Sequence, residues 1–349
     1  MLPKRGLDCV AYWPHTNPMR GKDGIFAPAA PARADARRTF LQHLGHRLRQ
    51  VPAASSTPSK AALFGGEWNL IGGSAKRRTA PANLEILMYQ IGPAWHDLEG
   101  SIARWQLWAY LGLQDIKLRY RRSLLGPFWI TLSMAMTIMG VGILYAKIMH
   151  TNMHDYFPFF TVGFMVWSYI ASLITEGSTV FINDGGYIRQ VPGPLLTYML
   201  RSTWRSMIIF FHNFIIFFAV AAYLEIWSGW GYLLAIAGFA LVTINCTWIA
   251  LLAGILSARY RDIPQIVQSL VSVLFFLTPV IWQSNQLNGR FAFIEFNPFY
   301  HFLEVVRAPL LNAPIDPRSW LITGGLAVLG WIFALLFFGR YRRRIVYWV

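Results

Sequence analysis

Side chains that could do chemistry are few and far apart in this chain of 349 residues. His150 and His154 have the i,i+4 spacing that puts two side chains on one helix face, but no further ligand is close in sequence. A solvated pair in a loop is therefore favoured over a metal site. Cys9 and Cys246 are too far apart in sequence to read as a metal motif.

Motifs for phosphate binding and hydrolysis give no better candidate. The only Gly-Lys dipeptide, Gly21–Lys22, is followed by Asp and lacks the glycine pattern of a Walker loop. The patterns G-x-S-x-G, H-E-x-x-H and C-x-x-C do not occur. An enzyme at a membrane surface could use Asp155 or Asp262, yet neither has a partner carboxylate close in sequence. We therefore assign no catalytic residue and no metal ligand.

The chain contains six long apolar runs, and these runs must position the other side chains. Each has close to the length, about 20 residues, that a helix needs to cross a bilayer. The runs are Pro127–Ala146, Pro158–Ile174, Met207–Leu224, Gly231–Leu256, Ile263–Trp282 and Trp320–Phe338. All sixteen Asp and Glu lie outside them. A proton-relay pump is disfavoured, because intramembrane carboxylates are the usual proton carriers. His212, inside the third run, is interpreted as a neutral histidine bonded to a neighbouring helix.

Composition agrees with a membrane protein. The chain is 55% hydrophobic and 13% charged, whereas a soluble domain carries about 25% charged residues. The net charge of +15 comes from basic residues that lie mostly outside the apolar runs. Anionic lipid headgroups are therefore the expected counter-charge, and nucleic acid is not an expected partner.

The distribution of Lys and Arg predicts the orientation. Basic residues cluster before the first run, between the second and third, between the fourth and fifth, and after the sixth. The connections His150–Phe157 and Glu225–Trp230 contain no Lys or Arg, and the connection after the fifth run, with Arg290, Arg307 and Arg318, is the one discordant region. We therefore expect a multi-pass protein of the cytoplasmic (inner) membrane with six spans and both termini in the cytoplasm.

Residues 1–95 form a basic extension that we expect to be disordered. Ala27–Arg38 and Ala53–Lys60 are rich in Pro, Ala, Ser and Arg and show no sustained periodicity. Such composition cannot bury enough apolar surface to offset the entropy of ordering. The alternatives are a basic arm on the membrane surface and an over-long reading frame with its true start at Met88.

Residues 96–125 are expected to form an amphipathic helix along the inner membrane surface. Ile102, Trp105, Trp108 and Leu111 recur at three-residue spacing, and tryptophan favours the headgroup level. The chain then turns at Gly126 into the six-span domain, 126–349. The alternative is a buried helix of a small cytoplasmic domain.

Two further segments are interrupted by polar residues and prolines. Asn183–Arg205 contains Pro192 and Pro194 and is the largest cytoplasmic connection between spans. Phe291–Leu311 is too broken for a lipid-facing span, so we expect a pair of re-entrant half-helices on the outer side. A seventh span is the alternative, but it would place the C-terminal arginines outside.

Four ordered stretches resemble the permease subunit of type-2 ABC exporters of polysaccharides, the exporters of O-antigen, capsule and teichoic acid. Lys117–Leu132 (KLRYRRSLLGPFWITL) resembles the family's entry into its first span. Val162–Pro194 resembles its second span and cytoplasmic loop, Arg259–Trp282 its R-Y-R-D loop and fifth span, and Phe296–Leu311 its N-P-x-x-x-x-x-E-x-x-R outer segment. The resemblance covers about residues 100–349.

The resemblance implies an all-α integral membrane protein that forms a homodimer of six-span subunits with two ABC ATPase subunits below. ATP and magnesium would bind to the ATPase, so no cofactor is expected in this chain. The substrate would be a lipid-linked polysaccharide. The loop that receives ATPase movement would contain Asp184, Tyr187, Ile188, Arg189, Pro192 and Pro194. Gly185, Gly186 and Gly193 loosen that loop relative to the commoner bulky residues of the family.

The resemblance and the aromatic content together predict further site residues. Aromatic faces with few charges suit sugar rings, although interface belts and packing explain most membrane aromatics. The candidate channel-lining residues are Trp129, Trp167, Tyr169, Trp282, Phe299 and Tyr300. The candidate residues of a cytoplasmic gate or interface are Arg119, Arg121, Arg122, Arg259, Arg261 and Asp262. Glu304 and Arg307 mark the outer segment. The competing functions are export of a drug or other small molecule on the same fold, and membrane glycosyl transfer.

Overall fold

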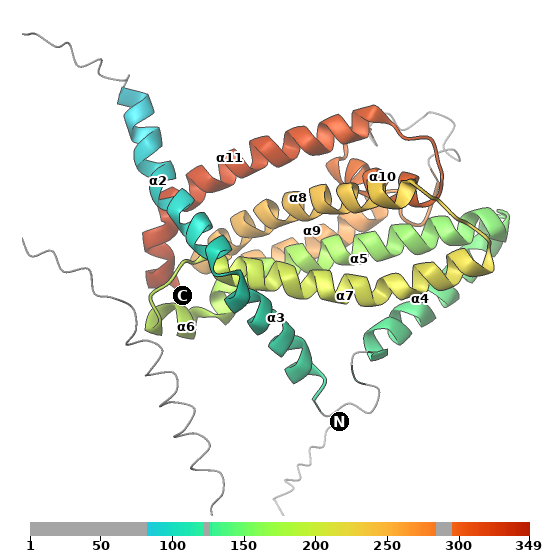
Figure 1. Ribbon diagram of the computed structural model, residues 1–349, viewed down its shortest axis with the longest axis horizontal. Coiled ribbons are helices and arrows are strands. Elements are labelled where there is room, and N and C mark those ends of the chain that lie inside the picture. Colours follow the sequence, from blue (N-terminus) through green and yellow to red (C-terminus); the bar gives the residue numbers. More distant parts are fainter. Residues whose placement is uncertain (1–81, 122–125, 127, 284–294) are drawn as a thin grey trace, which may run out of the picture. The chain divides into compact units, whose positions relative to one another are not determined.

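The computed structural model describes residues 82–121, 126, 128–283 and 295–349, all within one compact unit, Lys76–Val349 (Figure 1). Within these residues all regular structure is helical. The shorter helices are α2 (Ala82–Ala103), α3 (Trp105–Arg119), α6 (Gly185–Gln190), α9 (Ile263–Leu277) and α10 (Pro298–Leu310). The long helices are α4 (Phe128–Ile148), α5 (Met153–Asn183), α7 (Leu196–Tyr223), α8 (Gly231–Arg259) and α11 (Pro317–Trp348).

The five long helices are, by length and composition, the candidate membrane spans of the described residues. The expected all-helical membrane protein is therefore confirmed in its coarse form. The fifth apolar run, expected as a span over Ile263–Trp282, is helical only over Ile263–Leu277, which is about 22 Å at 1.5 Å per residue. Thr278 is extended, with ψ 137°. A residue before proline is driven out of the helical region, so Pro279 explains this end.

Helix α5 lies at the centre of the bundle. It contacts α4, α7, α8, α9 and α10, and 67% of its most apolar 18-residue stretch is buried, against 11% for α4. The helix begins earlier than expected, at Met153, because the Asn152 side chain accepts a hydrogen bond from the His154 backbone N–H (3.1 Å) and so caps it. Helix α4 therefore presents most of its apolar surface outward.

The bundle of helices has two ends (Figure 1). The first, which we call the basic end, holds α6, the start of α7, the C-terminal ends of α8 and α11, and the helices α2 and α3. The second, which we call the opposite end, holds the connections α4–α5, α7–α8 and α10–α11. Contacts tie each end together: Gly185 lies against Val349 at the basic end, and Asn312 donates to the Trp227 carbonyl at the opposite end.

The expected boundary at residue 95 is crossed by α2, which begins at Ala82; residues 1–81 lie outside the described residues. Tertiary contacts account for this helix, because it packs against α11 and the start of α7. The Asp97 carboxylate is buried and accepts hydrogen bonds from the backbone N–H groups of Leu195 (3.1 Å) and Leu196 (2.9 Å). Asp97 thus caps α7 from a distant segment, and Arg342 of α11 pairs with it at 2.5 Å.

The single interface helix expected over 96–125 is two helices with a break at Arg104. One side of α3 packs on α7, where Gly112 lies against Trp204 and the rings of Trp108 and Trp204 meet edge to face. The other side is exposed at Trp105, Tyr110, Leu113 and Leu118. Gly126 follows with φ +56°, a left-handed conformation that glycine adopts without strain, and this agrees with the expected turn before α4.

Of Phe291–Leu311, the structure describes residues 295–311, and helix α10 occupies most of them. With 13 residues it is too short for the seventh span considered above. It packs tightly on α8, because Gly238 has no Cβ and lets the Val305 carbonyl approach closely. The Asn297 side chain caps α10 and also donates to Thr278 at the end of α9 (3.0 Å). Helix α10 therefore starts beside the end of α9.

Candidate functional site: a braced helix at the basic end

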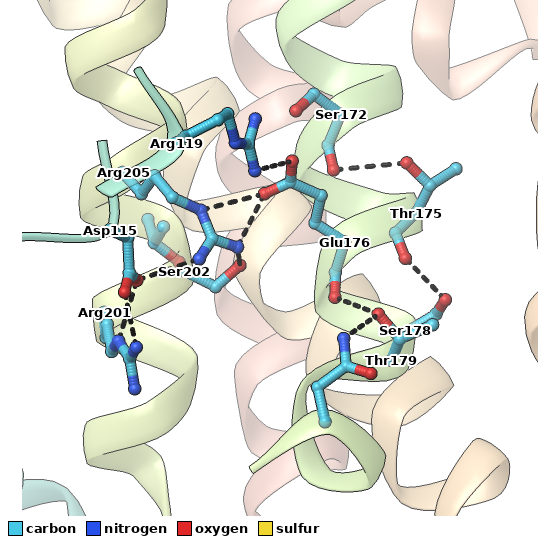
Figure 2. A network of polar contacts seen from close by, with 12 residues as sticks. Asp115, Arg119, Ser172, Thr175, Glu176, Ser178, Thr179, Arg201, Ser202 and Arg205 are labelled. Carbon is cyan, nitrogen blue, oxygen red and sulfur yellow. Dashed lines mark hydrogen bonds and ion pairs between the residues drawn. The ribbon is translucent and has the colours of Figure 1, made fainter. Parts of the chain in front are cut away.

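A network of ion pairs joins three helices at the basic end (Figure 2). Asp115 of α3 accepts hydrogen bonds from Arg201 of α7, with its Nε at 2.8 Å and Nη2 at 2.5 Å. Arg205, one turn later on α7, donates to the same carboxylate at 2.9 Å. Arg201 and Arg205 lie on one face of α7 because residues four apart are neighbours on a helix. The only acidic residue of α3 therefore attaches that helix to α7.

Helix α5 joins the network through Glu176. Its carboxylate accepts from Arg205 Nη2 at 2.7 Å and from Arg205 Nε at 3.1 Å. Arg119, at the end of α3, lies 3.6 Å from the same carboxylate and is about half exposed. Arg205 thus bridges Asp115 and Glu176, so α3, α5 and α7 share one arginine.

The network also reaches α6. Asp184 immediately precedes this helix, and its Oδ1 lies 3.2 Å from Arg201 Nη1. Ile188 is the buried anchor of α6, and Gly185 rests against Val349 at the end of α11. A displacement of α6 would therefore be transmitted through Arg201 to α7 and α3. It would also be transmitted directly to the end of α11.

The pKa values of the two aspartates of the network, Asp115 and Asp184, are shifted in opposite directions. Burial raises the pKa of Asp184, the nearby Arg201 lowers it only in part, and the charge of Asp115 adds to the rise. Burial would also raise the pKa of Asp115, but hydrogen bonds and charge from Arg201, with help from Arg205, outweigh burial and hold this pKa below its usual value. Asp115 is the firmly charged member, and Asp184 is the weaker partner of Arg201.

A cleft of about 290 Å³ lies within the network and is lined by charges of both signs. The described residues hold no group of three His, Cys, Asp or Glu that could bind a metal ion. The geometry thus suits a mechanical link that holds helices together and can be broken and remade.

The surface above this link is exposed. In the expected coupling segment, Tyr187 (63% exposed), Arg189, Gln190, Val191 and Pro192 point outward, whereas Ile188 is buried and Asp184 is half-buried. Pro194 precedes α7 and lies against Gly100 of α2. The segment expected as a loop is therefore a short helix followed by an exposed turn, held from below by one apolar side chain and one ion pair.

The structure divides the expected gate residues into two sets, and Arg122 lies outside the described residues. Arg119 belongs to the network above, and Arg121 is exposed. Arg259 stacks over Trp348 (5.8 Å to the ring centroid), Arg261 donates to the Trp348 carbonyl (3.4 Å), and Asp262 is exposed. Arg259 and Arg261 therefore contact the C-terminal end of α11.

The expected channel-lining aromatics also differ from one another. Trp167 (5% exposed) packs on Phe275 of α9 and Phe299 of α10, and Tyr169 (3% exposed) bonds to Thr243 of α8 at 2.8 Å. Burial inside one subunit favours a packing role for both. Trp129 on α4 is 49% exposed. The remaining candidates, Trp282, Phe299 and Tyr300, are half-buried at the opposite end.

The outer pair Glu304 and Arg307 forms an ion pair within α10. Arg307 is buried, donates to the Pro279 carbonyl at 2.8 Å and lies 4.0 Å above the Phe159 ring. His212 bonds to the Ile208 carbonyl of its own helix at 3.0 Å, whereas a bond to a neighbouring helix was expected. The His212 backbone carbonyl is the group that meets a neighbour, Thr131 of α4.

Sequence reasoning missed the carboxylates of the basic end: Asp97, Asp115 and Glu176. Arg201 and Arg205 were recognised only as a sign of orientation, although their i,i+4 spacing on an apolar helix also calls for acidic partners. The acidic partners of these arginines could not be identified from the sequence, because Asp115 is 86 residues from Arg201.

Comparisons with known proteins agree with this architecture. Residues 106–311 match the family described as ABC-2 type transporter. The O-antigen export system permease protein RfbA of Klebsiella pneumoniae is 21% identical over 210 residues, which is 58% of this chain and 79% of that protein. RfbA of Myxococcus xanthus is 24% identical over 216 residues (58% and 82%). The polysialic acid transport protein KpsM of Escherichia coli is 21% identical over 213 residues (59% and 81%).

Permeases of this kind work with ABC ATPase subunits and have no catalytic activity of their own. The family match covers more than half of the chain and contains α4, α5, α6, α7, α8, α9 and α10 in full. The chain therefore belongs to the ABC-2 type transporter family, as a membrane-spanning permease.

Proposed function

We propose that this chain is the channel-forming subunit of an ATP-driven exporter that moves a lipid-linked polysaccharide across the cytoplasmic membrane. Relatives named for O-antigen export and for polysialic acid transport support the substrate class, and the four sequence stretches described above support it independently. The basic end faces the cytoplasm in this proposal, in line with the positive-inside rule, so that both termini are cytoplasmic.

The observation that carries the proposal is the exposed helix α6 with its ion-paired base. An ATPase partner needs a cytoplasmic surface it can push, and that surface must be attached to the spans. Tyr187 and Arg189 are exposed for contact, and Asp184 attaches the start of α6 to Arg201 of α7. We assign α6 as the element that receives ATPase movement, with ATP and magnesium bound on the ATPase.

The active assembly in this proposal is a homodimer with two ATPase subunits. Two apolar surfaces are free to meet a second copy: the outward side of α4, and the side of α9 that exposes Ile266, Leu270, Val273 and Phe276. Gln265 and Ser269 lie among the apolar residues of α9 and are exposed, which is costly against lipid and suits a seam or a wet channel. Trp129 on α4 is then the candidate for stacking on sugar, and α9 with α10 forms a re-entrant outer segment.

A strain that lacks the chain tests the proposal. Polymer should accumulate inside the cells and return to the surface when the full-length chain is supplied. The double variant Tyr187→Ala with Arg189→Ala should insert into the membrane but leave the polymer inside. Tyr223→Ala, which changes a still more exposed tyrosine at the opposite end (86% against 63% for Tyr187), is the control and should export normally.

Normal surface polymer in the strain without the chain would refute polysaccharide as the substrate and would leave export of a small molecule as the function. Normal export by the Tyr187 and Arg189 double variant would instead leave the substrate intact and remove α6 as the coupling element. The two failures are thus distinguishable.

A further inference from the structure

A second cavity lies deeper in the subunit, between α4, α5 and α7. Its volume is about 320 Å³, within the range of small-molecule sites. Each of the three helices contributes a pair of polar side chains that share a face: Ser133 and Thr137, Ser168 and Ser172, and Ser206 and Asn213. Among the described residues, no charged side chain lines it. Three polar pairs from three different helices meet here, at a depth where lipid-facing side chains are normally apolar.

The depth follows from helix geometry. Ser206 is ten residues from the start of α7 and Asn213 is ten residues from its end, so each lies about 15 Å from one end of this helix. Water is scarce at such depth, and an unsatisfied polar group is costly there. An empty cavity lined by these polar side chains would therefore destabilise the subunit.

Two residues that line the cavity each carry a buried oxygen with no partner among the described residues. Ser206 Oγ and Asn213 Oδ1 make no hydrogen bond to any described residue, although their residues are only 2% and 5% exposed. By contrast, Ser133 donates to the Ile130 carbonyl and Thr137 to the Ser133 carbonyl, so their oxygens remain free only as acceptors. The cavity thus offers several free acceptors and few free donors.

The cavity continues the charged cleft inward. Ser172 lies one turn from Glu176 on α5, and Ser206 lies one turn from Ser202 on α7, and both Glu176 and Ser202 line the cleft at the basic end (Figure 2). Polar residues therefore form a continuous path from the basic end to the middle of the subunit. A ligand with hydroxyl groups could follow this path and exchange each hydrogen bond for the next.

We propose that this cavity binds a neutral group rich in hydroxyls, such as one sugar residue, which enters from the basic end. Hydroxyls suit it because each can donate to Asn213 or Thr137 and accept from Ser206. The absence of charged lining residues disfavours phosphate, carboxylate and ammonium groups. Phe164 and Phe210 add ring faces to the wall. The site lies inside one subunit, so it goes beyond the proposed channel and does not depend on which polymer is exported.

Protection of a single cysteine tests the site. In the full-length Cys9→Ser chain in lipid nanodiscs, Cys246 can stay because it is fully buried. Ser172→Cys then reports on the cavity, and Ala313→Cys, at an exposed position in the connection between α10 and α11, is the control reporter. An uncharged maleimide is the reagent. The probes are a monoglucosyl diacylglycerol included in the bilayer and a free disaccharide added at the basic end.

A probe at about ten times its Kd should slow alkylation of Ser172→Cys about elevenfold, since occupancy protects by the factor 1 + [L]/Kd. Alkylation of Ala313→Cys should not change. Protection by the glycolipid alone would assign the ligand to a lipid headgroup, and protection by the free disaccharide would assign it to unanchored sugar. Either result supports a site for hydroxyl-rich groups.

Adding Ser206→Ala and Asn213→Leu to the reporter chain should abolish the protection. Folding should survive, because apolar groups in place of unpartnered polar ones are close to neutral in stability. A reporter chain with Ser206→Ala as its one cavity substitution serves if the chain with both substitutions folds poorly. The proposal would be overturned if neither probe changed the alkylation rate of Ser172→Cys. It would also be overturned if bilayers of phosphatidylcholine only gave the same protection as the probes. In either case the cavity would be filled by water or by ordinary lipid.

Discussion

The two ends of the bundle use charged side chains in different ways. At the basic end, Asp115, Glu176, Arg201 and Arg205 are about 16–26% exposed and connect separate helices. At the opposite end, Arg307 is 4% exposed and has the Glu304 carboxylate, a backbone carbonyl and an aromatic ring around it. The first arrangement can be opened by water and remade, whereas the second leaves a buried charge if any partner moves. We infer that the basic end moves and the opposite end stays fixed.

The close packing of α10 on α8 allows the strongest test of whether the opposite end is fixed, and the largest effect is expected there. A Cβ at Gly238 would collide with the Val305 backbone, which cannot turn aside as a side chain can. Gly238→Val should therefore destabilise the subunit by about 3 kcal/mol, or prevent assembly. Gly140→Ala, at a helical glycine of α4 with no atom within 4 Å, should be neutral or slightly stabilising. Thermal unfolding in detergent measures both, and equal midpoints would contradict a fixed opposite end.

Loss of the shared carboxylate of α3 should have the next largest effect. Asp115→Ala leaves Arg201 and Arg205 without one partner each, and their partial burial places the cost between that of a surface pair and a buried pair, at about 2 kcal/mol. Export should fall more than stability does, because α3 no longer follows α7. Asp155→Ala removes a 74% exposed carboxylate at the opposite end and should change neither. Full ATP-driven export by Asp115→Ala would remove the network from the mechanism.

Two tryptophans separate packing from substrate contact. Trp167→Leu removes a ring that packs between α9 and α10 and should lower the free energy of unfolding by about 2 kcal/mol, with export per assembled complex little changed. Trp129→Leu, at a half-exposed ring of α4, should leave stability within about 0.5 kcal/mol and lower export of long polymer. The reverse pattern would move the channel wall from α4 to the inside of one subunit.

The smallest expected effect is on pH dependence. The pKa of Asp115 is lowered in the folded protein, so its contribution to stability is complete above its ordinary pKa and is lost as the pH falls through the lower folded value. Asp184 has a raised pKa, so its contribution falls as the pH rises through the interval from its ordinary value to that higher one. Wild type should therefore lose stability on strong acidification, below a pH of about 3.9, and Asp115→Asn should lose less. Identical acid profiles would show that Asp115 is not the charged member.

Periodicity and charge bias were sufficient for much of the fold. The apolar runs predict α4, α5, α7, α8 and α11, and lone prolines such as Pro279 mark where helices end. Boundaries that depend on distant side chains could not be predicted. Helix α7 starts where Asp97 caps it, 98 residues earlier in the chain, and α2 is held by packing on α11. A single sequence carries no signal for such pairs.

The candidate site was predictable only on its exposed surface. Tyr187 and Arg189 were found because they lie in a cytoplasmic connection that resembles a known family. The link beneath them was missed, since it pairs Arg201 with acids from two other segments. The aromatics were selected by residue type, which cannot separate the buried Trp167 from the half-exposed Trp129.

The most direct test of the account is to ask which surface touches the ATPase. A photo-crosslinking residue placed at Tyr187, which is 63% exposed on α6, should form a covalent adduct with the ATPase subunit in native membranes. The same residue at Trp227, which is 62% exposed at the opposite end, should form none. Adducts from Trp227 together with none from Tyr187 would contradict both the orientation and the role of α6.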